Sequence, residues 1–156
     1  MTTTKVLKFG GTSVGNADRI LQVAEIVKQN VGGARVGLVV SAVGGVTNLL
    51  LESANDVLGG RSPSIFVTKF IETHEAILRD VARIAPSAQL FDARTELDAI
   101  AEEYRNLLQG VGLLKECSPS VTDLLSSLGE RASVIIVNAV LSGAGLSVFR
   151  VDPREY

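Results

Sequence analysis

The stretch Lys8-Phe9-Gly10-Gly11-Thr12-Ser13 decides the fold of this chain. It completes a short β-prone run, Lys5–Phe9, and precedes a helical pattern from about Asn16 to Gln29. Apolar residues in that pattern recur every three or four positions, and Asn16 is a suitable N-cap. A strand that turns into a helix at two glycines predicts the start of an α/β domain.

The first turn has the chemistry of a phosphate site. Gly10 and Gly11 lack Cβ atoms, so backbone N–H groups can approach an anion closely, and the following helix adds the positive end of its dipole. Lys8 can place an ammonium group beside that anion, and Ser13 lies in the same loop. The spacing matches neither a Walker A motif nor Gly-x-Gly-x-x-Gly. A tight strand-to-helix turn with a surface lysine is an equally good interpretation.

A second strand is followed by a similar turn. Arg35–Val40 is apolar on both faces, which predicts a buried parallel strand, and the turn after it leads into a helical pattern over Val46–Leu58. Parallel strands that end in glycine-rich turns place both turns at one edge of the sheet. Ser41 and Thr47 offer hydroxyls to a polar ligand there, although capping is the commoner role for either residue taken alone.

Two amphipathic helices come next. Their apolar stripes span Phe66–Ile84 and Leu90–Leu108. The glycines of Gly110-Val111-Gly112 are expected to close the second helix.

The last third of the chain predicts a helix and a strand. Ser118-Pro119 is a good helix start, and helical character runs to about Leu141 with an interruption near Gly129. Leu146–Val151 predicts a third strand. The whole order predicts a helix-rich α/β fold with a mainly parallel sheet, of which this chain is expected to form the first part.

Composition restricts the class of protein. The chain has 156 residues, 46% of them hydrophobic and 21% charged, which excludes wholesale disorder. The formal net charge of −2 gives no case for nucleic-acid binding. Cys117 is the single cysteine, so no intramolecular disulfide forms. No apolar stretch approaches the roughly 20 residues that span a membrane, and the first residues do not resemble a signal peptide. We expect a cytoplasmic protein.

Four further residues are candidates for a role in binding or catalysis. Glu130 follows Gly129, where a carboxylate either stabilises a helix start or points into a cleft to bind an amine. His74 has no second histidine with which to share a metal, and Cys117 has no neighbouring histidine or basic cluster. Asp152, in Asp152-Pro153-Arg154, either faces the ligand edge or forms a plain turn. No metal ligands are predicted, and Glu102-Glu103 is expected to be a solvated helix face.

Three of these motifs together resemble the aspartate kinases of the amino-acid kinase superfamily. Lys8–Val14 is similar to their N-terminal signature, Ser41–Asn48 to their second turn, and Ser127–Glu130 to their Ser-x-Gly-Glu element. Order and approximate spacing agree, and the resemblance covers essentially the whole chain. Leu113–Asp152 looks most like the kinase part of bifunctional aspartokinase/homoserine dehydrogenases.

The resemblance implies a three-layer αβα sandwich and a reaction. MgATP would phosphorylate the side-chain carboxylate of L-aspartate, which opens the route to lysine, threonine, methionine and isoleucine. Lys8 matches the catalytic lysine, which neutralises charge on the transferred phosphoryl group. Three residues match the loop that lines the phosphate path: Gly10, Gly11 and Ser13. Three more match contacts to aspartate: Ser41, Thr47 and, for the α-ammonium group, Glu130.

The resemblance also implies what this chain lacks. Members of the family continue into a half-domain that binds most of the nucleotide, and into regulatory or dehydrogenase domains. We therefore expect residues 1–156 to form the substrate-side portion, with little activity alone and with a homo-oligomer as the full-length form. Two alternatives stay open: another superfamily enzyme with a carboxylate, carbamate or phosphate acceptor, and a non-catalytic interaction module.

Overall fold

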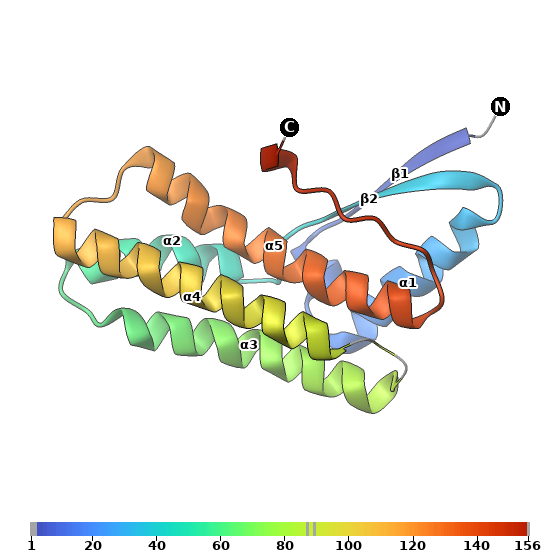
Figure 1. Ribbon diagram of the computed structural model, residues 1–156, viewed down its shortest axis with the longest axis horizontal. Coiled ribbons are helices and arrows are strands. Elements are labelled where there is room, and N and C mark those ends of the chain that lie inside the picture. Colours follow the sequence, from blue (N-terminus) through green and yellow to red (C-terminus); the bar gives the residue numbers. More distant parts are fainter. Residues whose placement is uncertain (1–2, 87, 89, 156) are drawn as a thin grey trace.

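The predicted strand–helix–strand unit opens the computed structural model, which describes residues 3–86, 88 and 90–155. In chain order the elements are β1 (Thr3–Phe9), η1 (Gly11–Val14), α1 (Ala17–Val31), β2 (Ala34–Val40), α2 (Val46–Leu58), α3 (Pro63–Ile84), α4 (Leu90–Leu114), α5 (Pro119–Gly143) and η2 (Pro153–Glu155). The helix-rich α/β architecture with a parallel sheet is confirmed (Figure 1).

The sheet of the described residues has two parallel strands. β1 and β2 pair in register from Thr3 beside Ala34 to Phe9 beside Val40. Helix α1 joins them and buries its apolar stripe, while the Asn16 side chain accepts a hydrogen bond from the Arg19 N–H. Asn16 is thus the N-cap of α1, as predicted.

Helices α2 to α5 form a bundle beside the sheet (Figure 1). Helix α5 supplies many of the fully buried side chains, Leu125, Leu128 and Ile136 among them. Among the described residues it is also the one helix long and apolar enough to cross a membrane, with a mean hydropathy of 1.5 over 18 residues. Because 61% of that window is buried inside the protein, α5 has the surroundings of a central core helix.

Two glycines predicted to break helices lie inside them instead. Helix α4 continues through Gly112 to Leu114, and α5 runs without interruption through Gly129. A Cβ on Gly112 would lie 3.1 Å from Val57 Cγ1, and one on Gly129 would lie 2.7 Å from Ala42 Cβ. These glycines let α2 and the turn before it approach closely, so tertiary packing overrides their helix-breaking tendency.

The predicted third strand is wrong for this structure. Residues 146–151 form no strand, and Arg150 pairs with Glu96 of α4 at 2.5 Å, which holds the segment over the helices. The burial predicted for both faces of β2 is also wrong, because Val39 is 51% exposed. We call the solvent-facing side of the sheet the open face; it carries Val6, Lys8, Arg35 and Val39.

Candidate functional site

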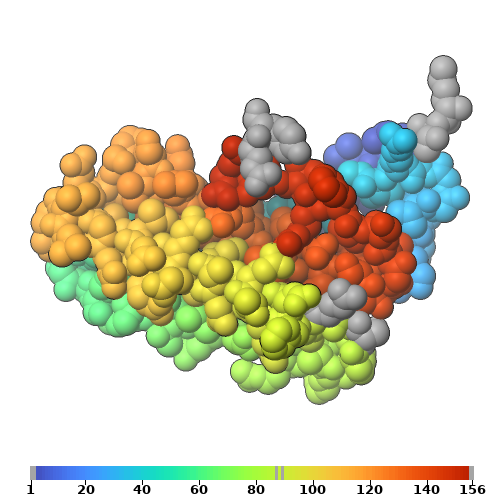
Figure 2. Space-filling view, viewed as in Figure 1, coloured from blue at the N-terminus to red at the C-terminus, as the bar shows by residue number. Residues whose placement is uncertain are grey.

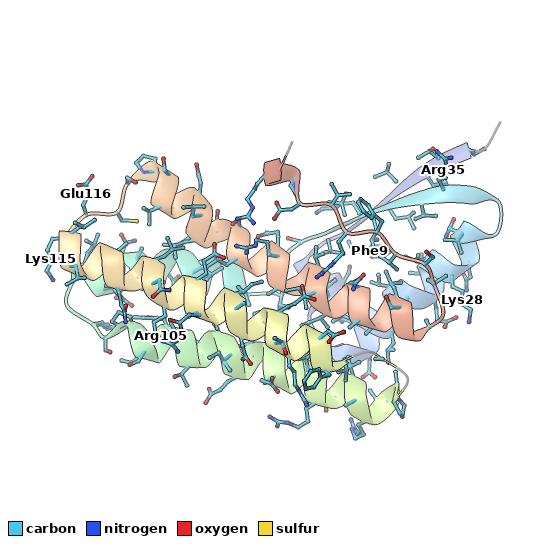
Figure 3. The ribbon with its side chains drawn as sticks, in the orientation of Figure 1. Phe9, Lys28, Arg35, Arg105, Lys115 and Glu116 are labelled. Atoms are coloured by element: carbon cyan, nitrogen blue, oxygen red, sulfur yellow. The ribbon has the colours of Figure 1, made fainter. Side chains whose placement is uncertain are left out.

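The two glycine turns meet at the carboxyl edge of the sheet, as predicted. The Ser41 N–H donates to the Phe9 C=O at 3.0 Å, one bond beyond the strands, and Figure 3 labels Phe9 at this point. A Cβ on Gly11 would lie 2.6 Å from the Ala42 carbonyl oxygen and 3.4 Å from Gly44 N. Only glycine fits position 11 without a shift of backbone, so the absence of a side chain there sets the contact between the turns.

Lys8 extends its amine toward the first turn. Its Nζ lies 3.8 Å from the position that a Cβ on Gly10 would occupy. Nothing in residues 3–86, 88 and 90–155 forms a hydrogen bond or ion pair with Lys8. Its charge is therefore available to an anion held at the turn. The alternative interpretation of Lys8, as a plain surface lysine, does not require the amine to lie beside the turn.

Ser13 lies within the short helical turn that follows. Its N–H donates to the Gly10 C=O at 2.8 Å, which closes η1, and its side chain is half-buried. The Arg19 guanidinium donates to the Thr12 C=O at 2.6 Å, so α1 fixes the turn from the far side. The first turn is thus held by backbone groups and by α1, which leaves the Ser13 side chain to a ligand.

The second turn presents Ser41 and Thr47, both half-buried. The N-cap of α2 is Gly45, at φ +85°, and no side chain caps this helix. Neither hydroxyl finds a hydrogen-bond partner in the part of the chain that the structure describes. Capping therefore does not account for these two residues.

Glu130 reaches the second turn from α5. Its Oε1 accepts a hydrogen bond from the Ala42 N–H at 3.3 Å, although 88 residues separate the two in sequence. Of the two interpretations of Glu130, the one that places it at a helix start is wrong, because it lies within α5. Gly129 is the cause of its position: without a Cβ at 129, α5 approaches Ala42 closely enough for the neighbouring carboxylate to reach the turn.

A cavity of about 800 Å³ opens beside Glu130. It is bounded by β2, α4, α5 and the C-terminal segment, which Figure 2 shows in red on the surface of the molecule. Asp152 lines this cavity, which none of the residues of the two glycine turns lines. A hydrogen bond from Arg154 lowers the pKa of Asp152 to about 2, which keeps the carboxylate charged.

Sequence reasoning missed an ion pair in the wall of this cavity. Arg131, next to Glu130, lies 2.8 Å from both carboxylate oxygens of Glu103 on α4. Glu103 is half-buried, so the expectation of a solvated face is wrong for this residue. The signal in the sequence was an arginine directly after Glu130, but only the packing of α4 on α5 brings its partner to it.

The remaining candidates lie outside the site. His74 is buried in the helical bundle, where its Nδ1–H donates to the Phe70 C=O at 2.7 Å, and burial lowers its pKa. Cys117 is half-buried near Thr122. No group of three or more His, Cys, Asp or Glu residues in the described ranges is arranged to hold a metal ion.

Comparisons with known proteins point to one family. The family model described as "Amino acid kinase family" matches residues 3–156. The bifunctional aspartokinase/homoserine dehydrogenase of Buchnera aphidicola is 28% identical over 153 residues, 96% of this chain and 18% of its own. Aspartokinase 1, chloroplastic, of Arabidopsis thaliana is 31% identical over 152 residues, 97% of this chain and 26% of its own.

A solved structure shares the fold. E. coli aspartokinase III, in complex with lysine and aspartate, superposes with a TM-score of 0.75 at 28% identity, over 93% of this chain and 30% of its own. The same enzyme in complex with aspartate and ADP gives a TM-score of 0.74. The chain thus spans less than a third of the length of each of these relatives.

Proposed function

Because the chain belongs to the amino acid kinase family, we propose that it carries the acceptor side of an aspartate kinase active site. The reaction transfers the γ-phosphoryl group of MgATP to the side-chain carboxylate of L-aspartate and yields ADP and 4-phospho-L-aspartate. The observation that carries the proposal is the convergence of Lys8, both glycine turns and Glu130 at one edge of the sheet.

The first turn is assigned to the transferred phosphoryl group. The Lys8 ammonium offsets the negative charge that builds on the phosphoryl oxygens, and it does so without giving up another partner. Gly10 and Gly11 leave the loop open to the phosphate, and Ser13 adds a hydroxyl. Catalysis on this side is positioning and charge stabilisation.

The second turn and α5 are assigned to aspartate. Oε1 of Glu130 is held by the Ala42 N–H, which leaves the second carboxylate oxygen for the α-ammonium group of the amino acid. Ser41 and Thr47 supply hydroxyls with no competing bond in the described structure. A carboxylate fixed in this way favours an amino-acid acceptor over a carbamate or phosphate acceptor.

MgATP is a substrate of this reaction, and we assign few of the contacts to MgATP to residues of this chain. The described residues supply no cluster of metal ligands, so they do not fit a resident magnesium site of their own. We assign most contacts to the nucleotide to a part of the domain beyond these 156 residues. The ADP complex of E. coli aspartokinase III supports a nucleotide substrate.

Cys117, as the one cysteine, supports a reducing compartment such as the cytoplasm.

A chimera tests the proposal. Residues 1–156 replace the matching region of E. coli aspartokinase III, and aspartate-dependent ADP release is measured. We expect turnover in the chimera, little turnover by the isolated chain, and a loss of at least about tenfold in kcat for Lys8→Ala, roughly 1.4 kcal/mol of barrier. Lys5→Ala is the matched control, because Lys5 lies on the same strand but donates to Asn30.

Three results would contradict the assignment. Robust turnover by the isolated chain would show that it is not a partial site. If the Lys8→Ala chimera retains more than about a tenth of the activity, Lys8 is not the catalytic lysine. A chimera that folds but phosphorylates no amino acid favours the non-catalytic module.

A further inference from the structure

The carboxylates that line the cavity beside α5 differ in their partners. Three of them pair with arginines of the same cavity: Glu103 with Arg131, Glu96 with Arg150, and Asp152 with Arg154. Glu130 is the fourth, and within residues 3–86, 88 and 90–155 it pairs with no cation. Its Oε1 accepts a hydrogen bond from the Ala42 N–H. Because each of the three pairs cancels its own charge, the negative charge of this wall is concentrated on Glu130.

The pair of Arg131 and Glu103 is the one closest to Glu130 along the chain. Arg131 directly follows Glu130 on α5, so the two side chains leave the helix about 100° apart. The Arg131 Nη1 lies 2.8 Å from both carboxylate oxygens of Glu103 on α4. The two side chains are 27% and 36% exposed, so water screens their charges only in part. The guanidinium is thus bound to the carboxylate of another helix, although its neighbour in sequence is also a carboxylate.

The charge of Arg131 acts across the cavity. Hydrogen bonds from Arg154 are the main cause of the lowered pKa of Asp152, and the charge on Arg131 adds to them in the same direction. A charge that reaches Asp152 also reaches a ligand that lies between Asp152 and Glu130. The loss of either member of the pair would therefore change the electrostatic potential at a ligand bound to Glu130.

We propose that Arg131 and Glu103 form a charge-cancelling pair, which leaves Glu130 as the one ammonium-binding carboxylate of this wall and sets the selectivity of the site between acidic amino acids and simple amines. Without Arg131, the charge of Glu103 would attract a simple cation and repel the carboxylates of an amino acid such as aspartate. Without Glu103, the free guanidinium would do the opposite. The inference rests on the proposed function for the assignment of the ammonium group to Glu130.

Two ammonium ligands of different net charge test the pair. At neutral pH n-butylammonium is a simple cation, whereas L-aspartate carries an ammonium group together with a net negative charge. Each is titrated into the isotope-labelled chain, and NMR follows the amide resonance of Ala42, because that N–H bonds to Glu130. We expect both ligands to shift this resonance. Succinate, which has the two carboxylates but no ammonium group, should leave it unchanged.

The ratio of the two dissociation constants separates a charge effect from a structural one. Arg131→Gln should raise the affinity for n-butylammonium relative to that for aspartate at least about threefold, and Glu103→Gln should lower it by a similar factor. The double variant Arg131→Gln/Glu103→Gln should restore the wild-type ratio, because both charges are then absent. A loss of packing would weaken both ligands alike, and a second substitution would not rescue it.

Arg105→Gln is the matched control. Arg105, which Figure 3 labels, pairs with Glu102 on the same helix as Glu103, and neither partner lines the cavity. The ratio should be unchanged in this variant, and circular dichroism checks that every variant folds. An unchanged ratio in either single variant of the pair would overturn the proposal. A double variant that does not restore the ratio would do the same, as would an Ala42 resonance that neither ligand shifts.

The titrations do not depend on catalysis. The expected ratios together with a chimera that shows no aspartate-dependent ADP release would support the charge-cancelling pair and count against the proposed function. Turnover in the chimera together with unchanged ratios would do the reverse.

Discussion

Gly129→Ala should destabilise the protein although alanine is the better helix former. The new Cβ would lie 2.7 Å from Ala42 Cβ, 3.2 Å from Val46 Cγ1 and 3.4 Å from Leu50 Cδ1. The first distance is about 1 Å short of the carbon–carbon optimum, and Ala42 Cβ cannot rotate away because it is attached directly to the backbone. Helix α5 or the second turn must therefore move.

The magnitude follows from two opposing effects. Overpacking a core costs about 1–3 kcal/mol, while replacing glycine in a helix gains about 1 kcal/mol. We expect a net loss of up to about 2 kcal/mol in the free energy of unfolding, which lowers Tm by up to about 8 °C for a chain of this size. Urea and thermal unfolding followed by circular dichroism measure both quantities.

Gly110→Ala is the control for this substitution. Gly110 also lies inside a helix, α4, but a Cβ there would meet nothing within 4 Å. It should stabilise the protein by up to about 1 kcal/mol. If Gly129→Ala stabilises the protein as much as Gly110→Ala does, the close approach of α5 to Ala42 is not the reason for glycine at 129. In the chimeric enzyme, Gly129→Ala should also raise the KM for aspartate, because it displaces Glu130 from the turn.

Two further predictions concern the helical core. Burial lowers the pKa of His74, so below pH 6.5 the unfolded chain takes up a proton that the folded chain does not. The contribution of His74 to the free energy of unfolding should therefore be constant above pH 6.5 and fall below it, by up to about 1.4 kcal/mol per pH unit. His74→Gln should flatten that slope in urea titrations from pH 5 to 7.5. A slope unchanged in His74→Gln would assign the effect to other groups. Tyr104→Phe removes the bond from the Tyr104 hydroxyl to Ser53, 2.7 Å long, and should cost about 1 kcal/mol, because Ser53 still donates to the Leu50 C=O. A loss above about 3 kcal/mol in thermal unfolding would mean that a buried polar group is left without a partner.

Local sequence signals were sufficient for the first half of the fold. The helix predicted over Val46–Leu58 has these bounds in the structure, and Asn16 caps α1. Both glycine turns lie at one edge because parallel strands must end together, which pattern alone can predict. In the first two cases the deciding interactions lie within a few residues of the signal, and in the third they follow from the pairing of the two strands.

Features set by distant contacts could not be predicted in this way. Gly129 has the local signature of a helix break, and its actual role depends on Ala42, far away in sequence. The partner of Arg131 is on another helix. Leu146–Val151 has the composition of a strand, but a strand exists only where a ladder forms, and here Arg150 bonds to α4.

The bond from the Ser41 amide to the Phe9 carbonyl has a consequence for how such a site can evolve. It consists of main-chain atoms alone, so the spacing of the two loops is inherited from the strand ladder and is indifferent to which side chains they carry. Under the proposed assignment, selectivity for the acceptor can therefore drift through exchanges at positions 41, 47 and 130 while the loop assigned to the phosphate keeps its place. A slip of one residue between the strands, in contrast, would send Lys8 to the opposite surface of the sheet and erase the site in a single step.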